Sequence, residues 1–183
     1  MNKQLEDISK FLSYVLRHKP DAIGLTLDDG GWANVRELVA CASLDGRLLT
    51  AELVCATVEY DHKQRYSLNA NQTRIRANQG HSIAVNLDLV PKIPPAVLYH
   101  GTASRFEASI RENGLTAATR QYVHLTHDEA TAVTVGKRHG QPVILKIDTT
   151  AMLAAGHEFY LSENNVWLCK TVPVKFLVFP DLH

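Results

Sequence analysis

The sequence predicts an α+β protein built from two lobes, on three observations. Apolar residues recur at helical spacing in three segments before residue 60, and two strand-like segments around a turn follow them. Prolines then gather in a connector, at Pro91, Pro94 and Pro95. Beyond the connector, short apolar runs alternate with helix-like segments. We therefore expect one lobe over residues 1–90 and a second, mixed α/β lobe over residues 95–183.

Three helices and a hairpin make up the expected first lobe. The apolar residues of its first helix, and the proline that ends it, are Leu5, Ile8, Leu12, Val15 and Pro20. Asn34 and Glu37 have the form of a capping box, and Thr50 precedes a further helix-like segment. Segments 65–68 and 73–76 flank a turn-rich stretch, which is typical of a β-hairpin. Three helices followed by a hairpin is the order of a winged helix.

The second lobe is expected to alternate strands with helices. Phe106 and Ile110 lie on one face of a helix that Gly114 ends. Thr126 and Glu129 have the form of a second capping box, so we expect a helix to begin at Thr126. The remaining elements are a strand at 142–147, a short helix at 151–155, and strands at 159–161, 166–168 and 174–179.

Composition and charge exclude several classes of protein. The 183 residues are 45% hydrophobic and 21% charged, which is ordinary for a globular protein. The formal net charge of +0 predicts neither a nucleic-acid nor a membrane partner, so any phosphate site must be a local cluster. The three cysteines show no CxxC spacing, and no segment is long and apolar enough to span a membrane. We therefore expect a cytoplasmic monomer with reduced cysteines and no membrane contact.

Two short apolar runs, 98–102 and 122–126, each end in a histidine and a small or hydroxyl residue. We interpret them as buried strands that bring His100 and His124 to one crevice at the strand ends of an open α/β sheet. Gly101 would let a phosphate or a sugar approach the backbone there. The alternative is that each histidine is a structural residue.

Cations gather at two places in the first lobe. Arg17, His18 and Lys19 end the first predicted helix, where the helix dipole favours positive charge, but three such residues also resemble an anion site. Both interpretations stay open. The segment 63–81 contains no acid, and its cationic or titratable residues are Lys63, Arg65, Arg74, Arg76 and His81. A charged strand face is often only solvated, yet we interpret this one as facing phosphate.

Several common chemistries lack their sequence motifs. Neither HExxH nor CxxC occurs, so we expect no metal site. Neither a Walker A loop nor a GxGxxG turn is present for nucleotide binding. The cysteines lie inside apolar helices or strands, which argues against a cysteine nucleophile. A pocket with two histidines and an arginine-rich surface remain.

Five motifs in order resemble the NAD-dependent RNA 2′-phosphotransferase family. They are LSYVLRHKP at 12–20, IRANQGHS at 75–82, LYHGT at 98–102, YVHLT at 122–126 and VGKRHG at 135–140. The resemblance covers the chain from about Leu12 to Leu177. It implies an N-terminal winged-helix lobe that holds RNA and a C-terminal lobe with the ADP-ribosyltransferase fold.

The resemblance also implies a reaction with NAD⁺ as co-substrate. An internal 2′-phosphate, of the kind left at a tRNA splice junction, attacks the nicotinamide ribose and expels nicotinamide. This gives a 2′-phospho-ADP-ribosylated RNA. The ribose 2″-hydroxyl then attacks phosphorus and releases 2′-hydroxyl RNA and ADP-ribose 1″,2″-cyclic phosphate.

The residues that the resemblance assigns fall into two sets. The catalytic set is Arg17, His18, Arg76 and Arg138, and the NAD⁺-binding set is His100, Gly101, Thr102, Ser104 and His124. Guanidinium groups suit two phosphorus-bearing substrates because they keep their charge. His18 is the titratable member of the catalytic set and therefore the candidate for proton transfer.

One position separates this family from ADP-ribosyltransferases that modify proteins, many of which carry a glutamate on a late strand. We expect apolar Val166 at that position, since a carboxylate would repel a phosphate acceptor. Glu163 fills the position if the expected register is shifted. Two other functions stay open: an ADP-ribosyltransferase that stops after the first step, modifying a nucleic-acid phosphate or a protein, and a ligand-sensing winged-helix regulator without turnover.

Overall fold

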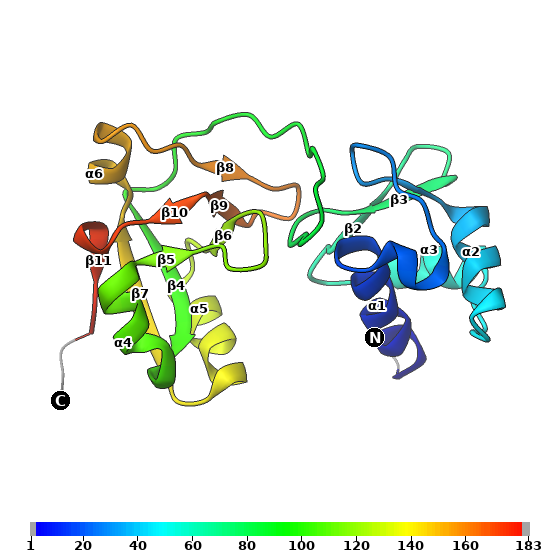
Figure 1. Ribbon diagram of the computed structural model, residues 1–183, viewed down its shortest axis with the longest axis horizontal. Coiled ribbons are helices and arrows are strands. Elements are labelled where there is room, and N and C mark those ends of the chain that lie inside the picture. Colours follow the sequence, from blue (N-terminus) through cyan, green and yellow to red (C-terminus); the bar gives the residue numbers. More distant parts are fainter. Residues whose placement is uncertain (1–2, 181–183) are drawn as a thin grey trace. The chain divides into compact units, whose positions relative to one another are not determined.

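The computed structural model describes residues 3–180. The chain divides into two compact units, Met1–Asp88 and Leu89–His183 (Figure 1). Each unit has its own hydrophobic core. Within the described residues, helices are too short or too polar to cross a membrane.

The first unit combines three α-helices with a small antiparallel sheet. Its elements are α1 (Lys3–Arg17), the 3-10 helix η1 (Pro20–Ile23), β1 (Ala33–Asn34), α2 (Val35–Leu44), α3 (Ala51–Glu59), β2 (Tyr66–Leu68) and β3 (Arg74–Ala77). The strands pair in the order β1-β3-β2. The expected sequence of three helices and a hairpin is confirmed. The short β1 strand was not predicted, because two residues are too few to show a period.

Local hydrogen bonds set where α2 and α3 begin. The side-chain oxygen of Asn34 accepts hydrogen bonds from the backbone amides of Arg36 and Glu37, at 2.9 and 3.2 Å. Thr50 Oγ1 accepts one from the amide of Leu53, at 3.2 Å. These two side chains accept hydrogen bonds from amides in the first turn that have no acceptor within the helix. The predicted starts of α2 and α3 are therefore confirmed.

The second unit is richer in strands. Its elements are β4 (Val97–Ala103), α4 (Ser104–Asn113), β5 (Leu115–Thr116), β6 (Val123–Leu125), α5 (Glu129–Gly136), η2 (Lys137–His139), β7 (Pro142–Asp148), α6 (Thr149–Ala154), β8 (Tyr160–Leu161), β9 (Trp167–Cys169), β10 (Thr171–Val172), η3 (Val174–Phe176) and β11 (Leu177–Val178). The strands form sheets of order β11-β7-β4, β6-β9-β8 and β10-β5, and every pair is antiparallel. The long strands β4 and β7 lie side by side (Figure 1).

A backbone bridge joins the sheet of β4 to the sheet of β6. The amide of Tyr99 donates to the carbonyl of Thr126 at 2.8 Å, and the amide of Thr126 donates to the carbonyl of Tyr99 at 3.0 Å. Helix α5 packs directly against β4, because Gly101 has no side chain. A Cβ atom on Gly101 would lie 1.8 Å from the carbonyl oxygen of Ala132. The sequence predicted a ligand close to this glycine, and the structure adds a packing reason for it.

Three sequence-based expectations are wrong in this unit. The strands form small antiparallel sheets rather than the open α/β sheet that was expected, and His100 lies in the middle of β4 rather than at its end. Helix α5 begins after Asp128, whose carboxylate accepts from the amide of Thr131 at 2.8 Å. Thr126 cannot cap this helix, because its backbone is still paired with Tyr99.

The expected strand at 174–179 is mostly a turn. The amide of Phe176 donates to the carbonyl of Pro173 at 3.0 Å and closes the 3-10 helix η3. Only Leu177–Val178 pair as a strand, with β7. The turn follows from tertiary packing of Phe176 into the core, which a local apolar run does not reveal.

Candidate functional site

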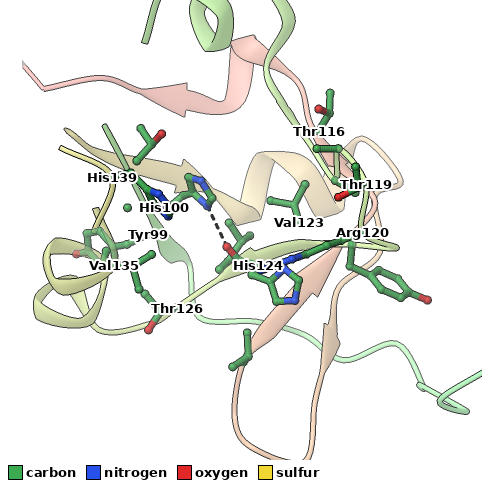
Figure 2. Close-up of a pocket in the computed structure, with 18 of the residues that line it drawn as sticks. Tyr99, His100, Thr116, Thr119, Arg120, Val123, His124, Thr126, Val135 and His139 are labelled. Atoms are coloured by element: carbon green, nitrogen blue, oxygen red, sulfur yellow. Dashed lines mark hydrogen bonds between the residues drawn. The ribbon is translucent and has the colours of Figure 1, made fainter. Parts of the chain in front are cut away.

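A cavity of about 410 Å³ opens in the second unit, between β4, β6, α5 and the segment 116–122. Figure 2 draws its walls, with these residues labelled: Tyr99, His100, Thr116, Thr119, Arg120, Val123, His124, Thr126, Val135 and His139. Its volume lies within the range of about 300–1,000 Å³ that is usual for small-molecule sites. Apolar side chains form part of the wall, and hydroxyl, imidazole and guanidinium groups supply the polar contacts.

The two histidines of the sequence motifs meet in this cavity. His100 Nδ1 lies 3.0 Å from the backbone carbonyl oxygen of His124, and the bond is drawn in Figure 2. A carbonyl oxygen only accepts, so Nδ1 carries the proton and Nε2 is the acceptor of the neutral ring. Burial lowers the pKa of His100, although the bond to the His124 carbonyl opposes that shift. The ring is therefore neutral at physiological pH.

The residues assigned to NAD⁺ lie mostly in this cavity. His100, Gly101 and Thr102 come from β4, and His124 comes from β6. Ser104 begins α4 and is not among the described residues that line the cavity.

The cavity wall includes one of the two residues considered for the late strand. Val166 precedes β9 and lines the cavity, together with Asn165. Glu163 lies outside the lining set among the described residues, in a turn that Ser162 closes by hydrogen bonds to the backbone of Val166, both at 3.0 Å. Of the two residues, Val166 is therefore the one at the cavity wall.

Sequence reasoning missed several lining residues. Tyr99 and Thr126 line the cavity beside the backbone bridge, and Arg120 comes from the segment between β5 and β6. His139 also lines it, whereas Arg138 next to it is exposed on η2 and is not among the described lining residues. The motif at 135–140 could have pointed to His139, because it contains both residues.

The first unit carries a separate cluster of cationic groups. Arg17 ends α1, Arg76 lies on β3, and His18 and His81 belong to the segments that follow these elements. Burial is the largest cause that lowers the pKa of His81, to about 4, and the charges of Arg17, His18 and Arg76 lower it further. His81 is 1% exposed, and neither ring nitrogen has a hydrogen-bond partner among the described residues. The four groups therefore share one electrostatic environment.

Residues 80–82 pack against the C-terminal end of α1 and hydrogen-bond to it. The amide of Ser82 donates to the carbonyl of Arg17 at 2.9 Å, and Ser82 Oγ lies 2.9 Å from His18 Nδ1. Gly80 lies against the guanidinium of Arg17, since a Cβ atom there would be 3.6 Å from Nη1. These contacts fix Arg17 and His18 in relation to each other.

Two of the cations that were expected to face phosphate over 63–81 are paired with carboxylates. Arg74 forms an ion pair with Asp28, and Arg65 forms one with the buried carboxylate of Asp61. Arg76 instead stacks over the ring of Trp32, with its guanidinium carbon 4.7 Å from the ring centroid. Carboxylates thus offset two of the cations, and the excess positive charge lies around Arg17, His18 and Arg76.

The two sites differ in the chemistry that they can support. Fixed guanidinium groups around a histidine suit a phosphate group, because they stabilise its charge and leave one group able to move a proton. The cavity of the second unit suits a larger organic ligand with both apolar and polar parts. Among residues 3–180, no three histidine, cysteine or carboxylate side chains are grouped so that they could hold a metal ion.

Comparison with known proteins yields a family match over most of the chain. The model of the "RNA 2′-phosphotransferase, Tpt1/KptA family" matches residues 3–171. A protein of Pectobacterium carotovorum is 57% identical, over 96% of this chain and 95% of its own length. One from Pseudomonas aeruginosa is 56% identical, over 96% and 97%. One from Acaryochloris marina is 50% identical, over 97% and 98%. Each of the three is named "Probable RNA 2′-phosphotransferase".

Proposed function

Because the chain belongs to the RNA 2′-phosphotransferase, Tpt1/KptA, family, we propose that it removes an internal 2′-phosphate from RNA by transfer to NAD⁺. The supporting observation is that one chain carries two sites of different character. A cationic cluster around His18 suits the RNA phosphate, and a cavity around His100 suits the co-substrate. In this proposal the first unit is a winged-helix lobe and the second an ADP-ribosyltransferase-like lobe.

The first step asks the protein mainly to position its substrates. The 2′-phosphate is already an anion and attacks C1″ of the nicotinamide ribose, while nicotinamide leaves with the electron pair of the broken bond. The nucleophile has no proton to lose in this step. Arg17 and Arg76 hold the phosphate in place, and holding two reactants in line is a large part of such an acceleration.

The second step asks for charge stabilisation and proton transfer together. The ribose 2″-hydroxyl attacks phosphorus, and the bond from phosphorus to the RNA 2′-oxygen breaks. Charge builds on the phosphoryl oxygens, where fixed arginine donors act most strongly. His18 transfers the proton that the attacking hydroxyl loses or the departing oxygen gains. Arg138 joins this set in the proposal by the motif it occupies.

The polar groups of the cavity in the second unit support NAD⁺ as the co-substrate. His100 stays neutral there and offers Nε2 as an acceptor, so it adds no positive charge next to the cationic nicotinamide ring. The hydroxyl groups of Thr102, Thr116 and Thr119 supply contacts for ribose and phosphate oxygens. NAD⁺ bound there would bring the leaving group and the electrophilic ribose carbon to the reaction.

A second candidate function is ADP-ribosylation of a nucleic-acid phosphate or a protein without the second step. In this proposal Val166 occupies the position where many protein-modifying enzymes carry a carboxylate, and its apolar side chain at the cavity argues against a protein acceptor. A regulator without turnover is disfavoured by the first unit, whose cations gather around one titratable histidine rather than along α3.

The test uses the full chain, NAD⁺ and a short RNA with one internal 2′-phosphate, with products resolved by mass. The proposal expects 2′-hydroxyl RNA, free nicotinamide and ADP-ribose cyclic phosphate in equal amounts, with full activity in the presence of a chelator. A stable ADP-ribosylated RNA as the end product supports the second candidate instead. Phosphate removal without NAD⁺ refutes the proposed mechanism.

A further inference from the structure

We propose that a groove along α1 binds the RNA strand that flanks the phosphorylated nucleotide. This inference rests on the proposed function, since it takes His18 as the residue at the RNA phosphate. The groove encloses about 420 Å³ in the first unit, and the residues that line it are Glu6, Ser9, Lys10, Ser13, Tyr14, His18 and Arg65.

The groove is continuous with the cationic cluster. Its lining residues on α1 recur every three or four positions, which places them on one face of the helix. The adjoining face carries Leu5, Ile8, Leu12 and Leu16, which are buried in the core. The groove ends at His18, whose charge also acts on buried His81. A strand bound to the cluster by its 2′-phosphate therefore enters this groove directly.

The length of the groove suits several nucleotides. Glu6 and His18 are twelve positions apart, and the helical rise of 1.5 Å per residue gives a span of about 18 Å. Stacked nucleotides advance by about 3.4 Å each, so a strand of about five nucleotides is as long as the groove.

The side chains of the groove match those that bind single-stranded RNA. Tyr14 is 48% exposed and presents a ring on which a base can stack. Lys10 supplies a charge for a backbone phosphate; its exposed pair with Asp7, at 3.2 Å, is of the weak surface kind and does not hold it back. An aromatic ring next to a lysine in a half-open groove is the combination that sequence-tolerant RNA sites use.

The floor of the groove is held in place by a hydrogen-bond network. The hydroxyl of Tyr66 donates to the carbonyl of Ser9, at 2.5 Å, and lies 2.5 Å from Ser13 Oγ. Arg65, at the edge, is held by its ion pair with Asp61. Because the floor is already rigid, few protein side chains have to be ordered when RNA binds, and this raises the affinity for a flexible strand.

The charges along the groove predict whether each of two substitutions raises or lowers the affinity for RNA. Lys10 and His18 attract phosphate groups, whereas Glu6 at the far end repels them. The strand is therefore expected to bind more tightly when Glu6 is neutralised and less tightly when Lys10 is removed.

The experiment measures the affinity of the full chain for labelled RNA pentamers by fluorescence anisotropy, with and without an internal 2′-phosphate. Tyr14→Ala is expected to weaken binding about tenfold, and Tyr14→Phe to keep it, because the ring does the stacking. Lys10→Ala should lower the slope of log affinity against log salt by about 0.7. Glu6→Gln should tighten binding. Tyr60→Ala is the matched control, since Tyr60 is 53% exposed at the end of α3 and is not among the described lining residues.

A phosphorylated dinucleotide provides a second control. Lys10 lies eight positions from His18, or about 12 Å along the helix, so a dinucleotide held at His18 is too short to reach it. Wild type and Lys10→Ala should therefore bind the dinucleotide equally. The inference is overturned if Tyr14→Ala and Tyr60→Ala bind the pentamer alike, or if an acidic peptide shows the same dependence on Tyr14 as the RNA.

Failure of the groove and failure of the proposed function give different results. If wild type converts the pentamer with NAD⁺ but Tyr14→Ala has no effect on binding, only the groove is wrong. If Tyr14 matters for binding but wild type converts no RNA, only the proposed function is wrong.

Discussion

His18 Nδ1 and Ser82 Oγ lie 2.9 Å apart, and this hydrogen bond selects which nitrogen of His18 is available to a substrate. Ser82 Oγ is also 3.5 Å from the carbonyl oxygen of Arg17, to which its hydroxyl donates. The serine oxygen therefore accepts from Nδ1–H of His18. Nε2 is then the nitrogen that can take or give a proton at the phosphate.

Removing the Ser82 hydroxyl should disturb this arrangement. Ser82→Ala is expected to slow the second chemical step about tenfold, the value of one lost orienting hydrogen bond, and to shift the pKa of its pH–rate profile. Ser82→Thr keeps the hydroxyl and should stay near wild type. Single-turnover rates across pH make the measurement. Identical profiles for Ser82→Ala and wild type would show that Ser82 does not position His18.

The two steps of the proposed reaction should respond to different residues. His18→Ala or Arg76→Ala should let 2′-phospho-ADP-ribosylated RNA accumulate, since loss of acid–base help costs about 10²–10⁴-fold and falls mainly on the second step. His100→Ala should instead slow formation of that species and raise the KM for NAD⁺. His127→Ala is the control for His100, because His127 is exposed and is not among the described residues that line the cavity.

The assay is a single-turnover time course on RNA labelled at its 2′-phosphate. Equal slowing of nicotinamide release and final product formation by His18→Ala, with no intermediate, would make His18 a binding residue.

His81 should make the first unit less stable in acid. Its pKa is lowered from 6.5 to about 4 in the folded chain, mainly by burial, so the unfolded chain binds more protons between these values. Its contribution to stability is present above pH 6.5 and is lost as pH falls toward 4, by up to about 3 kcal/mol.

Two measurements check this. NMR titration of wild type should find the His81 ring neutral until about pH 4, the value to which its pKa is lowered. His81→Gln should flatten the dependence of unfolding free energy on pH over the same window, whereas His62→Gln, at an exposed position of the same unit, should leave the slope unchanged. A His81 ring that titrates near 6.5 contradicts the prediction.

A carboxylate in place of the apolar side chain of Val166 should slow the reaction. Val166→Glu places an anion on the cavity wall, where it should repel a phosphate acceptor and lower the rate of the first step. Val166→Gln is similar in size but uncharged and separates the effect of charge from that of volume. Glu163→Gln should change little. Loss of turnover in Glu163→Gln alone would favour a protein-modifying reaction.

Gly101 should tolerate no side chain. In Gly101→Ala the new Cβ would meet the backbone of α5 at Ala132, so helix or strand must move, at a cost of about 3 kcal/mol in unfolding free energy. Gly156→Ala is the comparison: nothing lies within 4 Å of a Cβ there, and only its φ of +84° is unfavourable. That strain costs about 1 kcal/mol. Urea unfolding of both variants measures the difference, and equal stabilities would rule out the packing argument.

The features that could be predicted from the sequence are those that depend on residues close together in the chain. Asn34 and Thr50 cap helices through amides two or three residues away, so their patterns were sufficient. The position of His100 within β4 could not be predicted in this way. It depends on pairing with Leu145, forty-five positions further along, and this extends the strand past the histidine.

In the candidate site, too, the residues could be predicted from local motifs, but their contacts across the fold could not. The motifs identified His100 and His124 but not the arrangement that joins them, a side-chain bond to a main-chain carbonyl. The burial of His81, and the carboxylates that neutralise Arg65 and Arg74, depend on contacts between distant segments. No pattern within a short window contains that information.

The bridge between Tyr99 and Thr126 also bears on how this cavity can change in evolution. Both of its hydrogen bonds are made by main-chain atoms, so no exchange of side chains other than to proline removes a donor or an acceptor. The distance between the two cavity walls at this bridge is therefore set by the backbone and does not depend on the side chains at these two positions. New ligand preferences are therefore expected to arise from side-chain exchanges in the segment 116–122, while the spacing of the walls persists.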